Sequence, residues 1–254
     1  MCTIVVLRRS GHDWPVLVAA NRDEMSDRPW RSPARHWPDR VEVVGGLDEL
    51  SGGSWLALND HGLMAAVLNR YGTLGPAAGK RSRGELVLEA LDHADAAGAA
   101  EALADLNPAA YRPFNLVIAD DRDAFCLHHR DEAGRAPVEV VRLGEGLALI
   151  TAFDVDDLAD PRIRGARPRF EQASAPRPEA GDWSGWQSLL ASREPADPAE
   201  PRSALCFTTQ SGFATSSSAL IALPSRRKLA ARMPLWRFAP GPPDRAAWET
   251  VDLG

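Results

Sequence analysis

The first twenty-four residues constrain the fold of this chain more than any other stretch. Residues 3–8 (TIVVLR) and 15–20 (PVLVAA) are β-rich, and the intervening residues 10–13 (SGHD) are typical of a hairpin turn. In an antiparallel hairpin, the end of the second strand lies opposite the beginning of the first. We therefore expect Arg22 and Asp23 to be neighbours of Cys2.

Cys2 stands where processing can turn it into the first residue of the mature chain. Methionine aminopeptidases remove Met1 when the second residue is small, and cysteine qualifies. The new α-amine would titrate near pH 7.7–8.0 (about the range of model α-amines), so it could act as the base for its own thiol. This is the arrangement of an N-terminal nucleophile. The alternative is that Cys2 is only a small residue at the start of a strand.

Three further residues fit the same chemistry. Arg22 close to the sulfur would favour the thiolate and lower its pKa, and Asp23 could hold the amine in position. Asn69 follows the apolar run 63–68 and offers an amide NH₂ to an oxyanion hole. For Arg22 and Asp23, a purely structural ion pair at a strand end remains the alternative.

The rest of the chain predicts antiparallel strands around a helical block. Residues 25–40 and 173–201 have the composition of loops, and a tail is expected from about residue 240. This arrangement indicates an α+β fold with two packed sheets and helices outside them, in a single domain of residues 1–254. Further strands are expected at 41–44, 54–58, 63–68, 114–119, 124–129, 138–143, 147–152, 204–209 and 215–223, and helices at 82–96, 97–106, 161–172 and 184–191.

Composition narrows the class of partner. A net charge of −6 and a pI near 5.6 argue against nucleic acid, because phosphate binding needs a basic surface. No run approaches the roughly 20 apolar residues of a membrane span, and residues 3–7 are too short for a signal sequence. Three scattered cysteines fit a reducing cytoplasm. We expect a cytoplasmic protein that handles a small-molecule substrate or metabolite, without membrane or nucleic-acid partners; its oligomeric state is left open.

The histidines predict neither a metal site nor a required cofactor. His128 and His129 are adjacent on a predicted strand, so their side chains point to opposite faces and cannot easily share one ion. We expect one of them to be buried and the other to be solvated.

Five short motifs carry a resemblance to a known family. They are Met1-Cys2-Thr3, ANRDE at 20–24, GGSWL at 52–56, the stretch 62–69 that ends in Asn69, and FNL at 114–116. In these stretches the chain resembles the NRDE family, which includes the eukaryotic transport and Golgi organisation protein 2. The resemblance runs from residue 1 to about 130 and resumes more weakly at 214–223.

The resemblance implies an N-terminal nucleophile hydrolase-like fold, an αββα four-layer sandwich of two antiparallel sheets flanked by helices. Its layout is similar to that of the penicillin V acylases and bile salt hydrolases, which cleave linear amides. Cys2, Arg22, Asp23 and Asn69 match the site residues of those enzymes by position, although the Arg–Asp spacing differs. NRDE proteins usually carry Leu-Ser-Asn at 150–152 and Gly-Thr-Arg at 214–216, where this chain has Ile-Thr-Ala and Ala-Thr-Ser.

Two classes of function remain open at this point. In the first, Cys2 attacks a linear non-peptide amide or a thioester. In the second, which the resemblance implies, the protein handles a metabolite without catalysis, as in haem trafficking or the binding of acyl-CoA or lipid. Haem would be held non-covalently, with Cys2 and His128 or His129 as conceivable iron ligands.

Overall fold

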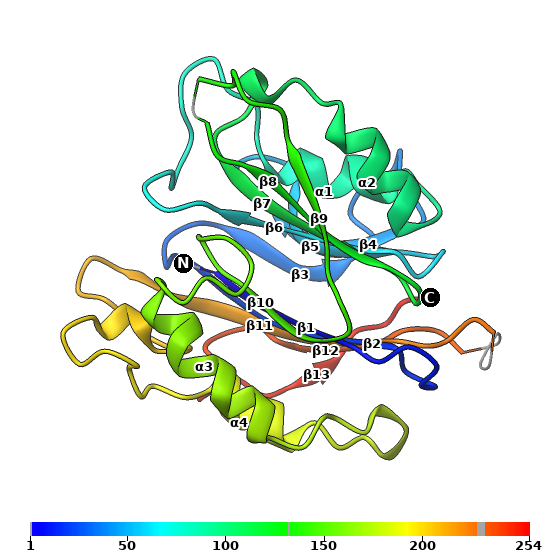
Figure 1. Ribbon diagram of the computed structural model, residues 1–254, viewed down its shortest axis with the longest axis vertical. Coiled ribbons are helices and arrows are strands. Elements are labelled where there is room, and N and C mark those ends of the chain that lie inside the picture. Colours follow the sequence, from blue (N-terminus) through cyan, green and yellow to red (C-terminus); the bar gives the residue numbers. More distant parts are fainter. Residues whose placement is uncertain (1, 132, 228–231) are drawn as a thin grey trace. The chain divides into compact units, whose positions relative to one another are not determined.

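The computed structural model describes residues 2–131, 133–227 and 232–254 (Figure 1). They form two compact units. Unit 1 contains the described parts of residues 1–28 and 145–251, and unit 2 contains those of residues 29–144 and 252–254. Each unit has one antiparallel sheet and two α-helices, which confirms the predicted α+β class.

Unit 1 is built on a six-stranded sheet in the order β10-β1-β2-β11-β12-β13. Helices α3 and α4 cover one face of it, where Phe170 and Trp186 pack with strand residues such as Leu17 and Leu220. The elements are β1 (Thr3–Arg8), β2 (Val16–Met25), β10 (Gly146–Ile150), α3 (Pro161–Gln172), η2 (Pro178–Ala180), α4 (Ser184–Leu190), η3 (Pro201–Ser203), β11 (Phe213–Leu223), β12 (Leu235–Ala239) and β13 (Glu249–Thr250).

The predicted first hairpin is confirmed. Strands β1 and β2 pair antiparallel, with Thr3 opposite Asn21 and Arg8 opposite Val16. The other edge of β2 pairs with β11, and this ladder has a bulge between Thr215 and Ser217. Strand β2 is therefore central in the sheet: it is paired on both edges up to Asn21, and residues 22–25 pair with β11.

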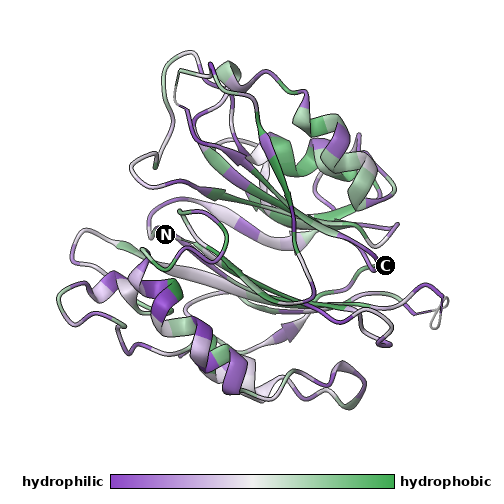
Figure 2. Cartoon of the chain, viewed as in Figure 1, coloured by the Kyte–Doolittle hydropathy of each residue, from purple (hydrophilic) through white to green (hydrophobic). Residues whose placement is uncertain are grey.

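Unit 2 is a seven-stranded meander in the order β3-β4-β5-β6-β7-β8-β9. Helices α1 and α2 pack on it through an apolar cluster that includes Leu86, Leu103 and Leu116. Figure 2 shows these two helices as largely hydrophobic, whereas α3 in unit 1 carries more hydrophilic residues. The elements are β3 (Trp30–Ala34), β4 (Val43–Asp48), β5 (Ser54–Asn59), β6 (Met64–Asn69), α1 (Gly84–Leu91), α2 (Ala96–Ala104), η1 (Pro108–Ala110), β7 (Phe114–Ala119), β8 (Ala124–His129) and β9 (Glu139–Arg142).

Several predicted boundaries need correction. Residues 25–40 are not only a loop, because β2 extends to Met25 and β3 lies within them. The first predicted helix ends early, at Leu91, since Asp95 caps the next helix by accepting a hydrogen bond from the Gly98 amide at 2.9 Å. The predicted tail from about residue 240 carries the short strand β13.

The predicted strand at 204–209 is wrong. This segment forms only an isolated bridge, between Thr208 and Ala214. Phe207 instead bonds to Thr215: its amide donates to Thr215 Oγ1 at 3.2 Å, and its carbonyl accepts from the Thr215 amide at 3.0 Å. The segment is therefore anchored to the first residues of β11, Phe213 to Thr215, without forming a strand. Strand β12 was not predicted, because its five residues stand between irregular stretches rich in proline.

Within the described ranges, no helix combines the length and the apolar character that crossing a membrane requires.

Candidate functional site

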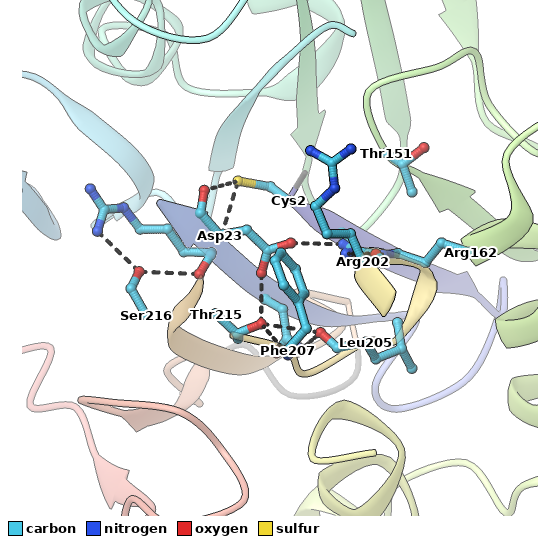
Figure 3. A network of polar contacts seen from close by, with 12 residues as sticks. Cys2, Asp23, Thr151, Arg162, Arg202, Leu205, Phe207, Thr215 and Ser216 are labelled. Atoms are coloured by element: carbon cyan, nitrogen blue, oxygen red, sulfur yellow. Dashed lines mark hydrogen bonds and ion pairs between the residues drawn. The ribbon is translucent and has the colours of Figure 1, made fainter. Parts of the chain in front are cut away.

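Cys2 lies against the backbone of Asp23, as the hairpin predicts (Figure 3). The Asp23 amide donates to Cys2 Sγ at 3.4 Å, and the thiol donates to the Asp23 carbonyl at 3.6 Å. The Cys2 side chain is half-buried. The sulfur therefore faces the main chain of Asp23 in these two contacts.

The Asp23 carboxylate is fully buried and is bound through both of its oxygens. Oδ2 accepts from Arg162 Nη1 at 2.7 Å, and Oδ1 accepts from Thr215 Oγ1 at 2.8 Å (Figure 3). A buried charge is tolerated only when it is paired and hydrogen-bonded. The predicted role of Asp23 toward the α-amine stays a prediction, because Met1 is outside the described residues.

Arg162 was not identified from the sequence as part of the site. Its guanidinium has no solvent exposure, lies 5.2 Å from the Phe207 ring centroid, and donates through Nε and Nη2 to the Arg202 carbonyl. Nη1 also donates to Thr3 Oγ1 at 2.9 Å. In the sequence, Arg162 is one of four arginines on the same helix, and no local signal separates it from the others.

The first turn of α3 is fixed by Asp160. Its Oδ1 accepts from the Arg162 amide at 2.8 Å, which makes Asp160 the N-cap, and Pro161 takes the first helical position. Its Oδ2 accepts from Thr151 Oγ1 at 2.6 Å. Thr151 is the middle residue of the Ile-Thr-Ala stretch, and its hydroxyl donates to the Asp160 carboxylate. Thr215 is the middle residue of the Ala-Thr-Ser stretch, and its hydroxyl donates to the Asp23 carboxylate.

Arg22 makes contacts other than the predicted one. Its side chain is largely buried. Nη1 donates to Ser216 Oγ at 3.2 Å, and Ser216 Oγ donates to the Arg22 carbonyl at 3.1 Å. The predicted effect of Arg22 on the thiol pKa stays a prediction, and the net shift of that pKa has other causes. Burial raises the pKa of the Cys2 thiol, and the Asp23 carboxylate raises it further.

Asn69 belongs to unit 2, so its place is described separately. It is the last residue of β6, lies opposite Phe114 in β7, and is half-buried. Among the described contacts of the chain, its side-chain amide makes no hydrogen bond. Its predicted part in catalysis stays a prediction.

The two strand histidines occupy opposite faces, as predicted, but both are buried. His128 Nδ1 lies 2.7 Å from Asn115 Oδ1, which also accepts from Arg70 Nη1 at 2.6 Å. The His129 ring packs 5.5 Å from Phe114 between centroids. With exposed fractions of 2% and 0%, neither histidine is solvated, which corrects the expectation for one of them.

These histidines do not fit the haem alternative. An axial ligand must present an imidazole nitrogen to an open pocket, whereas His128 and His129 are enclosed in the sheet and its packing. Across the residues that the structure describes, no group of three or more His, Cys, Asp or Glu side chains could hold a metal ion.

Three solved structures with a similar fold are named as an acid amidase ortholog, an acylase and a bile acid hydrolase. A Caenorhabditis elegans ortholog of N-acylethanolamine-hydrolyzing acid amidase matches with a TM-score of 0.55 and 14% identity, over 86% of this chain and 92% of that chain. Penicillin V acylase from Agrobacterium tumefaciens matches at 0.51 and 16%, over 99% and 86%. A variant of conjugated bile acid hydrolase from Clostridium perfringens matches at 0.51 and 13%, over 98% and 96%.

At these identities the likeness shows the fold alone, which is the N-terminal nucleophile hydrolase fold that the resemblance implied. No curated protein sequence matches the chain. A family model does match, over residues 1–165, and its description is Transport and Golgi organisation 2. The matched region covers well over half of the chain and includes Cys2, Asp23, Asn69 and Arg162. The chain belongs to the Transport and Golgi organisation 2 family.

Proposed function

We propose that this protein is an N-terminal nucleophile hydrolase that cleaves a linear, non-peptide amide or a thioester with Cys2. The contact of Cys2 Sγ with the Asp23 backbone, beside a carboxylate fixed by Arg162 and Thr215, is the observation that supports this most. The names of the structural neighbours, an amidase, an acylase and a bile acid hydrolase, favour an acyl group joined to an amine as the substrate class.

The proposed reaction begins when the α-amine of mature Cys2 takes the thiol proton. The sulfur then attacks the substrate carbonyl carbon, the C–N bond breaks, and the leaving amine takes a proton from the ammonium. A water molecule hydrolyses the resulting thioester, which releases a carboxylic acid and restores the thiol. A thioester substrate would follow the same course with a thiol as leaving group.

The electrostatics of Cys2 favour an assisting base over a preformed thiolate. Burial and the Asp23 carboxylate hold the pKa of the thiol above its ordinary value. A proton acceptor within reach of the sulfur is then needed at neutral pH. The α-amine of Cys2 can serve only after Met1 has been removed, so activity should depend on that removal.

The test starts from intact mass and then measures turnover. Protein from a host with methionine aminopeptidase should lack Met1 and should hydrolyse members of a panel of N-acyl amides and acyl thioesters, followed by mass spectrometry of the released acids. Cys2→Ala should abolish turnover. A matched control inserts one glutamate between Met1 and Cys2, which keeps the thiol but removes its α-amine. Retained Met1, or equal turnover by Cys2→Ala, would contradict the proposal; ligand binding without turnover would favour the metabolite-handling alternative.

Asn69 is tested in the same assay. As an oxyanion donor, its replacement in Asn69→Ala should lower kcat by about 10²–10³-fold, the usual effect of losing such a donor. Unchanged turnover in a folded Asn69→Ala protein would remove Asn69 from the proposed mechanism.

A further inference from the structure

We propose that Arg162 is a positioning residue for Cys2: it fixes the Asp23 carboxylate and balances its charge beside the thiol. This inference deepens the proposed function and rests on Cys2 being the nucleophile. Arg162 is in helix α3, 139 residues from Asp23 along the chain, and the two are joined only by the fold.

Arg162 acts on both chain segments that flank the sulfur. The same nitrogen, Nη1, donates to Thr3 Oγ1 at 2.9 Å and to Asp23 Oδ2 at 2.7 Å. Thr3 is the residue next to Cys2 in the chain, and Asp23 is the residue whose backbone contacts Cys2 Sγ. One donor atom therefore bonds both to the strand that begins directly after Cys2 and to the strand that the sulfur contacts.

The guanidinium is itself held in one orientation. Nε and Nη2 both donate to the Arg202 carbonyl, and the Phe207 ring lies against the guanidinium at 5.2 Å. The backbone amide of Arg162 donates to Asp160, which caps α3. Figure 3 shows Arg162 at one oxygen of the Asp23 carboxylate and Thr215 at the other. A planar fork fixed in this way can set the direction of a carboxylate as well as pair with its charge.

The charge of Arg162 acts on the Cys2 thiol through the Asp23 carboxylate. The Asp23 carboxylate is one of the causes that raise the thiol pKa. A guanidinium nitrogen 2.7 Å from Oδ2, with both side chains buried, offsets part of the negative potential at the sulfur. Loss of that guanidinium should strengthen the influence of Asp23 on the thiol and make the thiolate harder to form.

The experiment is a double-mutant cycle on thiol reactivity. The rate of Cys2 alkylation by iodoacetamide is measured from pH 6 to 10 by mass spectrometry of the N-terminal peptide, which separates Cys2 from the other cysteines. At pH 7.5, Cys2 in the Arg162→Met variant should be alkylated about threefold to tenfold more slowly than in the wild type, an effect within the coupling energies of neighbouring residues. The curve of alkylation rate against pH should shift to higher pH. Arg162→Lys keeps the charge without the fork, so we expect only about a twofold fall.

In the Asp23→Asn background the effect of both Arg162 substitutions should disappear, because the carboxylate through which Arg162 acts is gone. Arg164→Met is the matched control: Arg164 is on the same helix, is exposed, and donates to the Leu158 carbonyl. It should leave the profile unchanged. Circular dichroism and a melting curve establish that each variant is folded, and Arg162→Lys carries the test if Arg162→Met does not fold.

An unchanged profile in a folded Arg162 variant would overturn the inference, and so would an equal shift in the Asp23→Asn background. Alkylation needs no substrate. A coupled Arg162 effect in a protein that hydrolyses nothing would therefore contradict the proposed function alone, while hydrolysis with an Arg162-independent profile would contradict this inference alone.

Discussion

Two cysteines of unit 1 lie beside an aspartate–arginine pair, and the atoms that face the sulfur differ. Cys2 contacts the backbone of Asp23, whose carboxylate is bound by Arg162 and Thr215. Cys206 instead donates its thiol proton to the carboxylate itself, at 3.3 Å from Asp244 Oδ1. The same two residue types thus surround a sulfur in two different ways.

The second arrangement holds the thiol protonated. Burial and the hydrogen bond to Asp244 raise the pKa of Cys206 to about 11, while Arg193 holds the pKa of Asp244 at about 2. Arg193 Nε and Nη2 donate to Asp244 at 2.7 Å and 3.1 Å. This cluster ties the segment before β11 to the C-terminal stretch. A cysteine near an aspartate and an arginine is therefore not by itself a nucleophile site. Cys2 differs from Cys206 in that its sulfur contacts the backbone of the aspartate and not the carboxylate.

The largest expected difference between the two pairs is in stability. The side chains of Asp23 and Arg162 are both 0% exposed, whereas those of Arg193 and Asp244 are 38% and 21% exposed. Removing one partner of a buried pair leaves an uncompensated charge and costs about 3–5 kcal/mol, against about 1 kcal/mol or less for a solvent-screened pair. Arg162→Met should therefore lower the free energy of unfolding in urea far more than Arg193→Met does.

A second variant sharpens that comparison. Replacing both buried partners by apolar residues, as in Asp23→Leu with Arg162→Met, leaves no unpaired charge. The double variant should lose less stability than the sum of the two single losses. Equal losses in the free energy of unfolding for Arg162→Met and Arg193→Met would show that burial does not make the Asp23–Arg162 pair more important for stability than the Arg193–Asp244 pair.

The next effect is on reactivity. At pH 8 a thiol with a pKa of about 11 is about one-thousandth thiolate, so Cys206 should resist iodoacetamide in the native protein. Asp244→Ala removes the acceptor of the thiol proton, so the pKa of Cys206 should fall and its alkylation should accelerate about tenfold, as read from the peptide that carries it. The Cys2 rate in the same sample is the internal reference and should not change. An unaltered Cys206 rate would mean that access, not protonation, protects this thiol.

These two sites also show what the sequence can predict. The neighbourhood of Cys2 and Asp23 follows from one hairpin, because a turn and two β-rich runs fix the register locally. The partner of Asp23 does not follow, since α3 carries four arginines and only its packing on the sheet selects Arg162. The Cys206–Asp244 contact joins irregular segments that have no period to read. The four helices of the described residues, most of their strands and the Cys2 hairpin could thus be predicted from the sequence. The contacts that set the charge around each sulfur could not.

The smallest expected effect is on acid stability at Asp244. Its carboxyl has a pKa of about 2 in the folded protein, against 3.8 as the ordinary value, so the unfolded chain binds a proton first as the pH falls. The Asp244 contribution to stability is present above about pH 4 and is lost progressively between about pH 4 and pH 2. Because the pair is partly open to solvent, screening keeps this contribution at about 1 kcal/mol or below. Urea unfolding of wild type and Asp244→Asn at pH 7 and pH 2.5 measures it. The stability gap between the two proteins should narrow at the lower pH, and a gap that is constant or widens on acidification would show that Asp244 acts in this cluster through packing and not through its charge.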